Sequence, residues 1–81
     1  MRVTFCLFGY LRERAGVSRL EMQLPAGATV AQAVEALARE KALDVPLLKS
    51  ARPAVNHEYC EYGQVLSEGD EVALIPPVSG G

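Results

Sequence analysis

The sequence contains too few cysteine and histidine residues to be organised around disulfides or a zinc ion. Among 81 residues there are two cysteines and one histidine. Cys6 and Cys60 form no CxxC pair and have apolar or aromatic neighbours, which argues against a disulfide-framed secreted protein and favours a reducing cytoplasm. A zinc site would need carboxylates to complete its ligands, because His57 is the single histidine. We therefore expect no bound metal and no bound cofactor.

The sequence also lacks an excess of positive charge and any long apolar segment. Eight basic and ten acidic residues give a formal net charge of -2, which argues against a nucleic-acid partner. The apolar runs are far shorter than the roughly 18–20 residues of a membrane-spanning helix. Residues 1–5 alternate in hydropathy, unlike the continuous apolar core of a signal peptide. These absences predict a cytoplasmic protein that binds neither nucleic acid nor membranes.

Length sets the scale of what the chain can do. At 8.7 kDa, with 49% hydrophobic residues, residues 1–81 are expected to form a single domain with a small core. Such a domain is too small to enclose much of a pocket by itself. We therefore expect it to take part in catalysis only within a complex.

Alternation of apolar and polar residues predicts strands near both ends of the chain. In residues 2–8 both the odd-numbered and the even-numbered residues are mostly apolar, which predicts a central strand with both faces covered. In residues 19–24 every second residue is polar, which predicts a half-buried strand. Residues 71–75 are apolar from Val72 onward and predict a second strand buried on both faces. Residues 53–55 predict a short strand, at a sheet edge because it contains proline.

In the middle of the chain the spacing of apolar residues changes from every second residue to a period of about 3.6 residues. Thr29 can cap a helix there, and Gln32 completes a capping box. Apolar residues on one face extend this helix over residues 29–41. A single helix crossing one face of a mixed sheet is the α+β, ubiquitin-like β-grasp arrangement. Strands 2–8 and 71–75 would then lie side by side and parallel, joined by a right-handed crossover.

The body of the chain offers no convincing catalytic set. His57 lies in a turn-like segment, and Cys6 lies within a strand pattern as a core residue. Cys60 has no positively charged neighbour in the sequence that would stabilise a thiolate. No glycine-rich phosphate loop links a strand to a helix. Chemistry is therefore expected elsewhere in the chain.

The C-terminal segment 76–81 is a projecting tail of two prolines followed by small residues. The prolines favour an extended course away from the body. The glycines have no side chains, so the end of the chain could enter a narrow channel of another protein and present its carboxylate there. Composition alone also fits an ordinary flexible tail. The tail residues are Pro76, Pro77, Val78, Ser79, Gly80 and Gly81.

Three segments resemble the MoaD family, the small subunits of molybdopterin synthase. These are GDEVALIPPVSGG over residues 69–81, FCLFGYLRERAG over residues 5–16, and Ala54-Val55-Asn56 with Glu58. The similarity covers nearly the whole chain. Other sulfur carriers share the final Gly-Gly without this Pro-Pro-Val-Ser lead. His57 is a departure, because many members have glycine there.

The resemblance implies a sulfur carrier that is not an enzyme on its own. An E1-like partner (MoeB) would use ATP to adenylate Gly81, which would then become a thiocarboxylate. The tail, residues 76–80, would insert into the active site of a large subunit (MoaE). There the sulfur would convert cyclic pyranopterin monophosphate into the dithiolene of molybdopterin. A heterotetramer of two small and two large subunits is expected.

Docking is expected to use an exposed apolar patch rimmed by charge. The candidate interface residues are Phe8, Leu11, Arg12, Leu74 and Ile75. Two alternatives stay open. One is a sulfur carrier for thiamine or for tRNA thiolation. The other is a ubiquitin-like modifier that would join Gly81 to lysine side chains.

Overall fold

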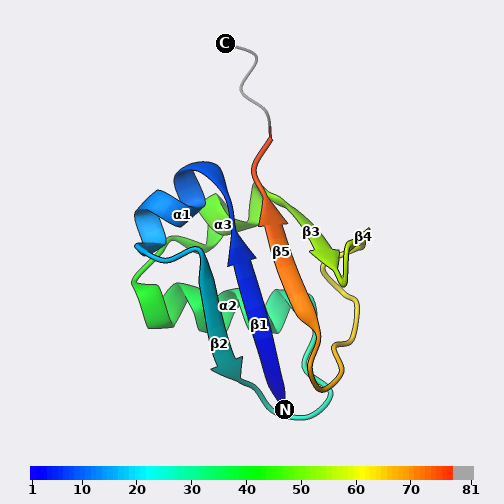
Figure 1. The fold of residues 1–81 in the computed structure, drawn as a ribbon. Coiled ribbons are helices and arrows are strands. Elements are labelled where there is room, and N and C mark those ends of the chain that lie inside the picture. The colour runs from blue at the N-terminus through cyan, green and yellow to red at the C-terminus, as the bar shows by residue number, and fades with distance from the viewer. Residues whose placement is uncertain (78–81) are drawn as a thin grey trace.

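The computed structural model describes residues 1–77, which form a mixed five-stranded sheet with helices packed against it (Figure 1). The strands are β1 (Arg2–Leu7), β2 (Arg19–Gln23), β3 (Arg52–Val55), β4 (Glu58–Tyr59) and β5 (Glu71–Ile75). The helices are α1 (Gly9–Ala15), α2 (Val30–Lys41) and α3 (Val45–Lys49). This is the β-grasp arrangement that the order of elements predicts. None of the helices in the described part of the chain has the length and apolar character needed to cross a membrane.

The strand order in the sheet is β2-β1-β5-β3-β4. β1 and β5 are parallel neighbours, with Phe5 beside Val72, and the other strand pairs are antiparallel. The prediction that the first and last strands lie side by side and parallel is therefore confirmed. Both strands finish at the same end of the sheet, and we call this the tail end of the molecule.

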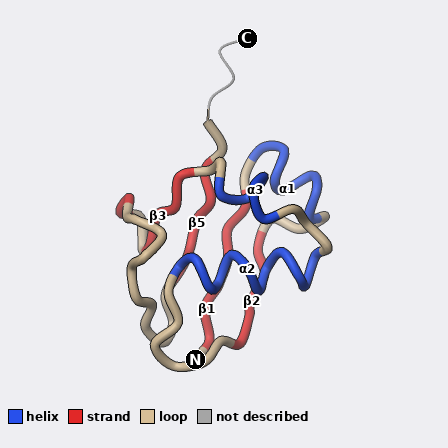
Figure 2. The backbone as a smooth tube through the Cα atoms, turned by 180° about the vertical axis from the view of Figure 1, so that it is seen from behind, coloured by secondary structure: helices blue, strands red, loops and turns tan. Residues whose placement is uncertain are grey.

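Helix α2 lies across one face of the sheet and closes the core (Figure 2). It begins at a complete capping box. The Gln32 backbone N–H donates to Thr29 Oγ1 at 3.2 Å, and the Thr29 N–H donates to Gln32 Oε1 at 2.9 Å. The predicted apolar face is buried, with Val34 and Leu37 both 0% exposed. The largest fully buried sheet side chains that contribute to this core are Val3, Phe5, Leu7, Val72 and Leu74.

The expectation that β5 is covered on both faces is wrong, whereas in β1 it holds at Cys6, which is only 7% exposed. In β5, Val72 and Leu74 are buried, but Ala73 and Ile75 on the opposite side are only half-buried. Helix α2 covers the core side alone, as the two views show (Figures 1 and 2). An apolar strand pattern indicates low polarity on both sides, but it does not say whether a second layer of the same chain covers the other side. We call the uncovered side the open face.

The proline-containing strand β3 is not at the edge of the sheet, because β5 and β4 flank it. The Pro53 carbonyl accepts a bond of 3.1 Å from the Cys60 N–H, on the β4 side. In an antiparallel ladder the N–H and C=O of one residue point to the same neighbour. The missing N–H of Pro53 therefore faces β4, which pairs only with Ala54 and Val55. Because β4 is only two residues long, Pro53 leaves no N–H of a strand hydrogen bond missing beside it, just as at the edge of a sheet.

The β3–β4 turn contains two residues with positive φ, Asn56 at 51° and His57 at 73°. Two-residue hairpin turns of this kind favour Asn-Gly. The Asn56 amide is held in place. It donates to Asp70 Oδ1 at 2.9 Å and accepts from the Glu71 N–H at 3.0 Å. His57 is highly exposed, and its Nε2 lies 3.6 Å from Oε1 of Glu71.

The first prediction follows from this turn. His57→Gly should raise the free energy of unfolding by about 1 kcal/mol, because glycine adopts positive φ without steric cost. For a domain of this size that corresponds to about 4–8 °C in melting temperature, which thermal denaturation can measure. Asn56→Gly is the control and should not stabilise, because it removes two side-chain hydrogen bonds. A melting temperature of His57→Gly equal to or below the wild-type value would contradict the argument.

Candidate functional site

The tail leaves the body at the end of β5, next to the start of α1. Pro76 is half-buried and Pro77 is exposed. Gly9 has a φ of +56°, and a Cβ added to it would lie 3.4 Å from Cγ of Pro76. Glycine therefore suits this position both by its conformation and by its close approach to the tail. The predicted tail residues Val78, Ser79, Gly80 and Gly81 lie outside the described residues.

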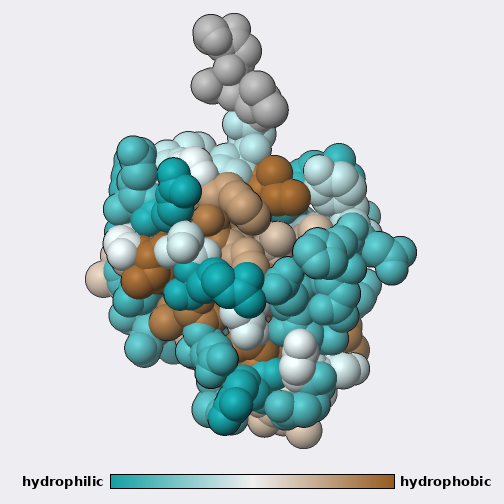
Figure 3. Space-filling model, in the orientation of Figure 1, coloured by the Kyte–Doolittle hydropathy of each residue, from teal (hydrophilic) through white to brown (hydrophobic). Residues whose placement is uncertain are grey.

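An apolar patch lies on the open face beside this exit. Phe8 continues β1 in extended conformation, so it follows Cys6 on the open face, and its exposed fraction is 48%. Ala73 and Ile75 of β5 lie on the same face and are half-buried. The space-filling view shows apolar surface over the upper parts of β1 and β5, bordered by hydrophilic residues (Figure 3). We define the apolar patch as Phe8, Ala73 and Ile75; Cys6 lies on the same face but is only 7% exposed.

Two of the five predicted interface residues belong to the core instead. Leu11 and Leu74 are both 0% exposed. Leu74 lies between Ala73 and Ile75 in β5, so the alternation of the strand turns its side chain toward the core side. Leu11 is one of the two buried residues of α1. Phe8, Arg12 and Ile75 stay accessible, and these three remain candidates for an interface.

Charged side chains border the patch on both sides. The Arg19 guanidinium in β2 donates to Sγ of Cys6 at 3.3 Å and to Oε2 of Glu71 at 3.3 Å. On the other side, the Arg52 guanidinium lies 3.9 Å from the centre of the Tyr59 ring, a cation–π contact. The predicted combination of an apolar patch and a charged rim is thus present on the open face.

The two thiols are poorly suited to act as nucleophiles. Burial raises the pKa of the Cys6 thiol, and the nearby Glu71 carboxylate raises it further, while Arg19 opposes this. Burial also raises the pKa of Cys60, with a further contribution from Glu61. The sequence did not reveal Arg19 as a neighbour of Cys6, because the pairing of β1 with β2 brings the two together. Both thiols therefore stay protonated at neutral pH.

A second prediction tests this conclusion. Iodoacetamide should modify Cys6 and Cys60 more slowly in the folded protein than in urea at the same pH, because only the thiolate reacts. In the folded protein the modification rate should rise only at a pH above that at which an ordinary thiol ionises, because the raised pKa values keep the thiols protonated to a higher pH. Mass spectrometry of the intact protein measures both rates. Native modification at neutral pH as fast as in urea would show an activated thiol.

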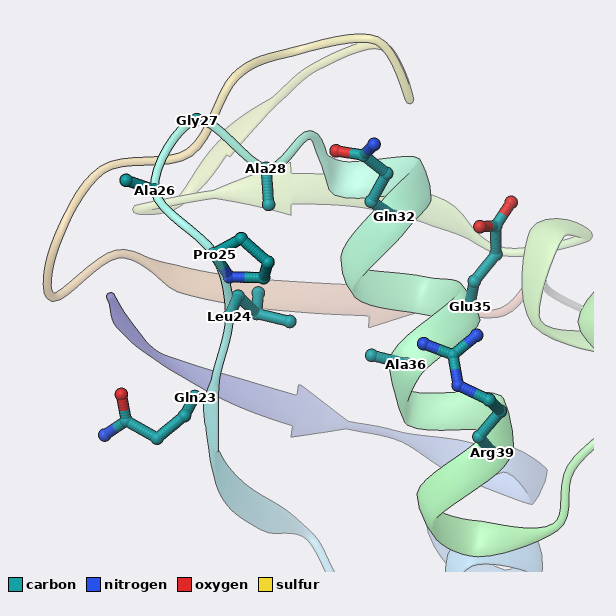
Figure 4. Close-up of a pocket in the computed structure, with 10 residues that line it drawn as sticks. All are labelled: Gln23, Leu24, Pro25, Ala26, Gly27, Ala28, Gln32, Glu35, Ala36 and Arg39. Carbon is teal, nitrogen blue, oxygen red and sulfur yellow. The ribbon is translucent and has the colours of Figure 1, made fainter.

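A separate hollow of about 490 Å³ lies between α2 and the connection from β2 (Figure 4). Its polar side chains are Gln23, Gln32, Glu35 and Arg39, and the remaining lining is small or apolar. Gln23 pairs with Arg2 at the start of β1, so the hollow lies at the end of the sheet opposite the tail. Within residues 1–77 no group of three or more His, Cys, Asp or Glu side chains could hold a metal ion. The apolar patch and the tail exit therefore form the candidate site.

The comparisons with known proteins agree with this picture. The ThiS family profile matches residues 6–81. The chain is 33% identical over 85 residues to a molybdopterin synthase sulfur carrier subunit of Arabidopsis thaliana, covering 100% of this chain and 84% of that protein. It is 38% identical over 84 residues to the protein of the same name from Chlamydomonas reinhardtii, covering 100% of both.

A third relative is the small archaeal modifier protein 1 of Haloferax volcanii. By sequence it is 35% identical over 83 residues, covering 93% of this chain and 95% of that protein. Its crystal structure superposes with a TM-score of 0.86 and 28% identity over 100% of both chains. The fold, the tail exit and these full-length similarities lead to one conclusion. The chain belongs to the ThiS family and is a relative of the MoaD-type sulfur carrier subunits of molybdopterin synthase.

Proposed function

We propose that this chain carries sulfur for molybdopterin synthesis as a thiocarboxylate on Gly81. The observation that carries the proposal is the position of the tail exit. The tail leaves the sheet beside an exposed apolar patch, while both thiols of the body are kept protonated. The full-length relatives named as molybdopterin synthase sulfur carrier subunits support it.

The proposed chemistry begins with activation of the terminal carboxylate. A free carboxylate is a poor acyl donor, because resonance and negative charge disfavour attack on its carbon. A MoeB-like E1 enzyme would transfer AMP from ATP to a carboxylate oxygen of Gly81, releasing pyrophosphate. Sulfide would then attack the acyl carbon and displace AMP, leaving a thiocarboxylate. Its sulfur is nucleophilic and can be passed to cyclic pyranopterin monophosphate.

The apolar patch is the proposed docking surface for a MoaE-like large subunit. Ile75 directly precedes the tail, and Phe8 precedes Gly9, which lies against Pro76, so docking there would fix where the tail enters the partner. Pro76 and Pro77 limit the conformations of the chain between the patch and the tail tip. The groups that bind and convert the pterin would belong to the large subunit, with two small and two large subunits in the assembly.

Mass spectrometry of the intact chain tests the proposal. The chain is incubated with the E1-like enzyme of the same genome, ATP and sulfide. The expected result is a gain equal to the mass difference between sulfur and oxygen, which is absent without ATP. The Cys6→Ser/Cys60→Ser variant should gain the same mass. A persulfide carrier would instead gain the mass of a whole sulfur atom on a cysteine, and the Cys6→Ser/Cys60→Ser variant would then gain nothing.

A second candidate function is that of a protein modifier, favoured by the similarity to small archaeal modifier protein 1. A modifier would transfer its activated Gly81 to a lysine amine. The product is then a covalent conjugate whose mass is that of the target plus the whole chain, less one water. A sulfur carrier for thiamine or tRNA would gain the same mass but would not support molybdopterin formation with the large subunit and cyclic pyranopterin monophosphate.

A further inference from the structure

Charge is distributed unevenly along the long axis of this acidic protein. The segments that meet at the tail end are residues 9–15 and 49–52, and they hold four basic residues and one acidic residue. The rest of the chain holds four basic and nine acidic residues, giving the overall -2. The basic residues at the tail end are Arg12, Arg14, Lys49 and Arg52, all exposed. The tail therefore leaves from the positive end of a molecule with negative net charge.

Three contacts bring these basic segments to the base of the tail. Arg52 is the register partner of Ile75, the last residue of β5. Gly9, in the helix that contains Arg12, lies against Pro76. The hydroxyls of Tyr10 and Ser50 are 3.2 Å apart, which joins α1 to the residue after Lys49. Figure 2 shows α1 and α3 close to the point where the chain leaves the body.

The cations at the tail end are not neutralised by ion pairs among the described residues. The pairs found in residues 1–77 are Arg2–Glu21, Arg19–Glu71 and His57–Glu71. The carboxylates at the opposite end are used locally. Asp70 accepts from the Ser67 N–H at 2.7 Å, and Glu68 accepts from the Arg2 N–H at 3.0 Å. Arg52 also lies over the Tyr59 ring, a contact that leaves its charge without a carboxylate partner among residues 1–77.

We propose that Arg12, Lys49 and Arg52 form a basic collar that binds carboxylates around the entrance of the partner's tail channel. The proposal rests on the proposed function, in which the tail enters a large subunit. Docking removes water from these cations, and that loss is offset only if negative groups face them. The uneven charge would also orient the molecule so that its tail end faces an acidic surface as it approaches, which raises the association rate.

The test measures the association rate constant between this chain and the large subunit of the same genome by stopped-flow fluorescence at low and high salt. Arg12→Glu/Lys49→Glu should slow association at least about tenfold at low salt, and the difference should shrink at high salt. The matched control is Arg39→Glu/Lys41→Glu in the last turn of α2, which makes the same charge change elsewhere. It should stay within about twofold of wild type. If Arg12→Glu/Lys49→Glu does not fold, Arg12→Gln/Lys49→Gln replaces it, and a smaller decrease in the association rate is expected.

Each alternative outcome contradicts the collar. Equal rates for the collar and control variants would show that only net charge matters. Faster association of the collar variant would show a basic channel entrance. Binding of a single-stranded RNA oligonucleotide that is lost in the collar variant, with no change in the large-subunit rate, would assign these cations to nucleic acid. Failure of the proposed function looks different, because the wild-type chain would then gain no sulfur and would not bind the large subunit at all.

Discussion

Deletion of Gly81 is expected to reduce sulfur transfer by at least about a hundredfold while the fold stays intact. The shortened chain ends in a carboxylate that is set back by one residue, about 3.3–3.6 Å of extended chain. A displacement of about 1 Å at a reacting atom can already cost on the order of a hundredfold in rate. The measurements are ATP-dependent mass gain with the E1-like enzyme and molybdopterin formation with the large subunit.

The controls for this deletion separate chemistry from folding. Addition of one alanine after Gly81 should be equally damaging, because the carboxylate then extends too far. The melting temperature of both variants should match wild type, because the buried core comes from residues 3–74. The shortened chain should still bind the large subunit through the apolar patch. Normal sulfur loading of the shortened chain would show that the terminal carboxylate is not the carrier group.

Replacement of Phe8 and Ile75 by alanine is expected to weaken binding to the large subunit by about one to two orders of magnitude. Residues at the centre of an interface can each contribute about 1 kcal/mol or more, so the loss of two of them corresponds to at least about one order of magnitude. Their loss should cost little stability, because Phe8 is 48% exposed and Ile75 is only half-buried. Isothermal titration calorimetry of Phe8→Ala/Ile75→Ala against the large subunit measures the dissociation constant.

Leu74→Ala is the matched control, since it removes a side chain of the same strand that faces the core. We expect it to lower the free energy of unfolding by about 2–5 kcal/mol, as large-to-small changes in a packed core do. Its binding per folded molecule should change little. If Phe8→Ala/Ile75→Ala destabilised the protein as Leu74→Ala does and left binding unchanged, the apolar patch would be part of the fold and not an interface.

The sequence alone predicts the features of this fold that depend on local chemistry. The helix from Val30 to Lys41 follows from the capping box at Thr29 and from the period of its apolar residues. Each of these signals depends only on residues that are close together in the sequence. The parallel pairing of β1 and β5 follows from the order of the elements, which is that of the β-grasp arrangement. The sequence also predicts a projecting tail, and residues 78–81 of that tail lie outside the described part of the chain.

What the sequence could not provide is the side on which each apolar residue lies. Leu74 and Ile75 are both large aliphatic residues, and only the position of α2 decides which of them is core. Arg19 and Cys6 are 13 residues apart, and the register of β1 with β2 makes them neighbours. Arg52 reaches the base of the tail through the register of β3 with β5. Features that depend on long-range register therefore appear only in the structure.

The central position of β5 also bears on damaged copies of the protein. β5 joins two halves of the sheet, β2-β1 on one side and β3-β4 on the other, so neither half contacts the other through a different strand. A protease that removes residues from Glu71 onward takes away both the tail and the strand that holds the sheet together. Such a fragment loses the fold along with the end that we propose to carry sulfur. A cut within β5 therefore leaves no folded competitor, whereas a cut between Pro76 and Gly81 would leave a folded chain that could still occupy the docking surface of a partner.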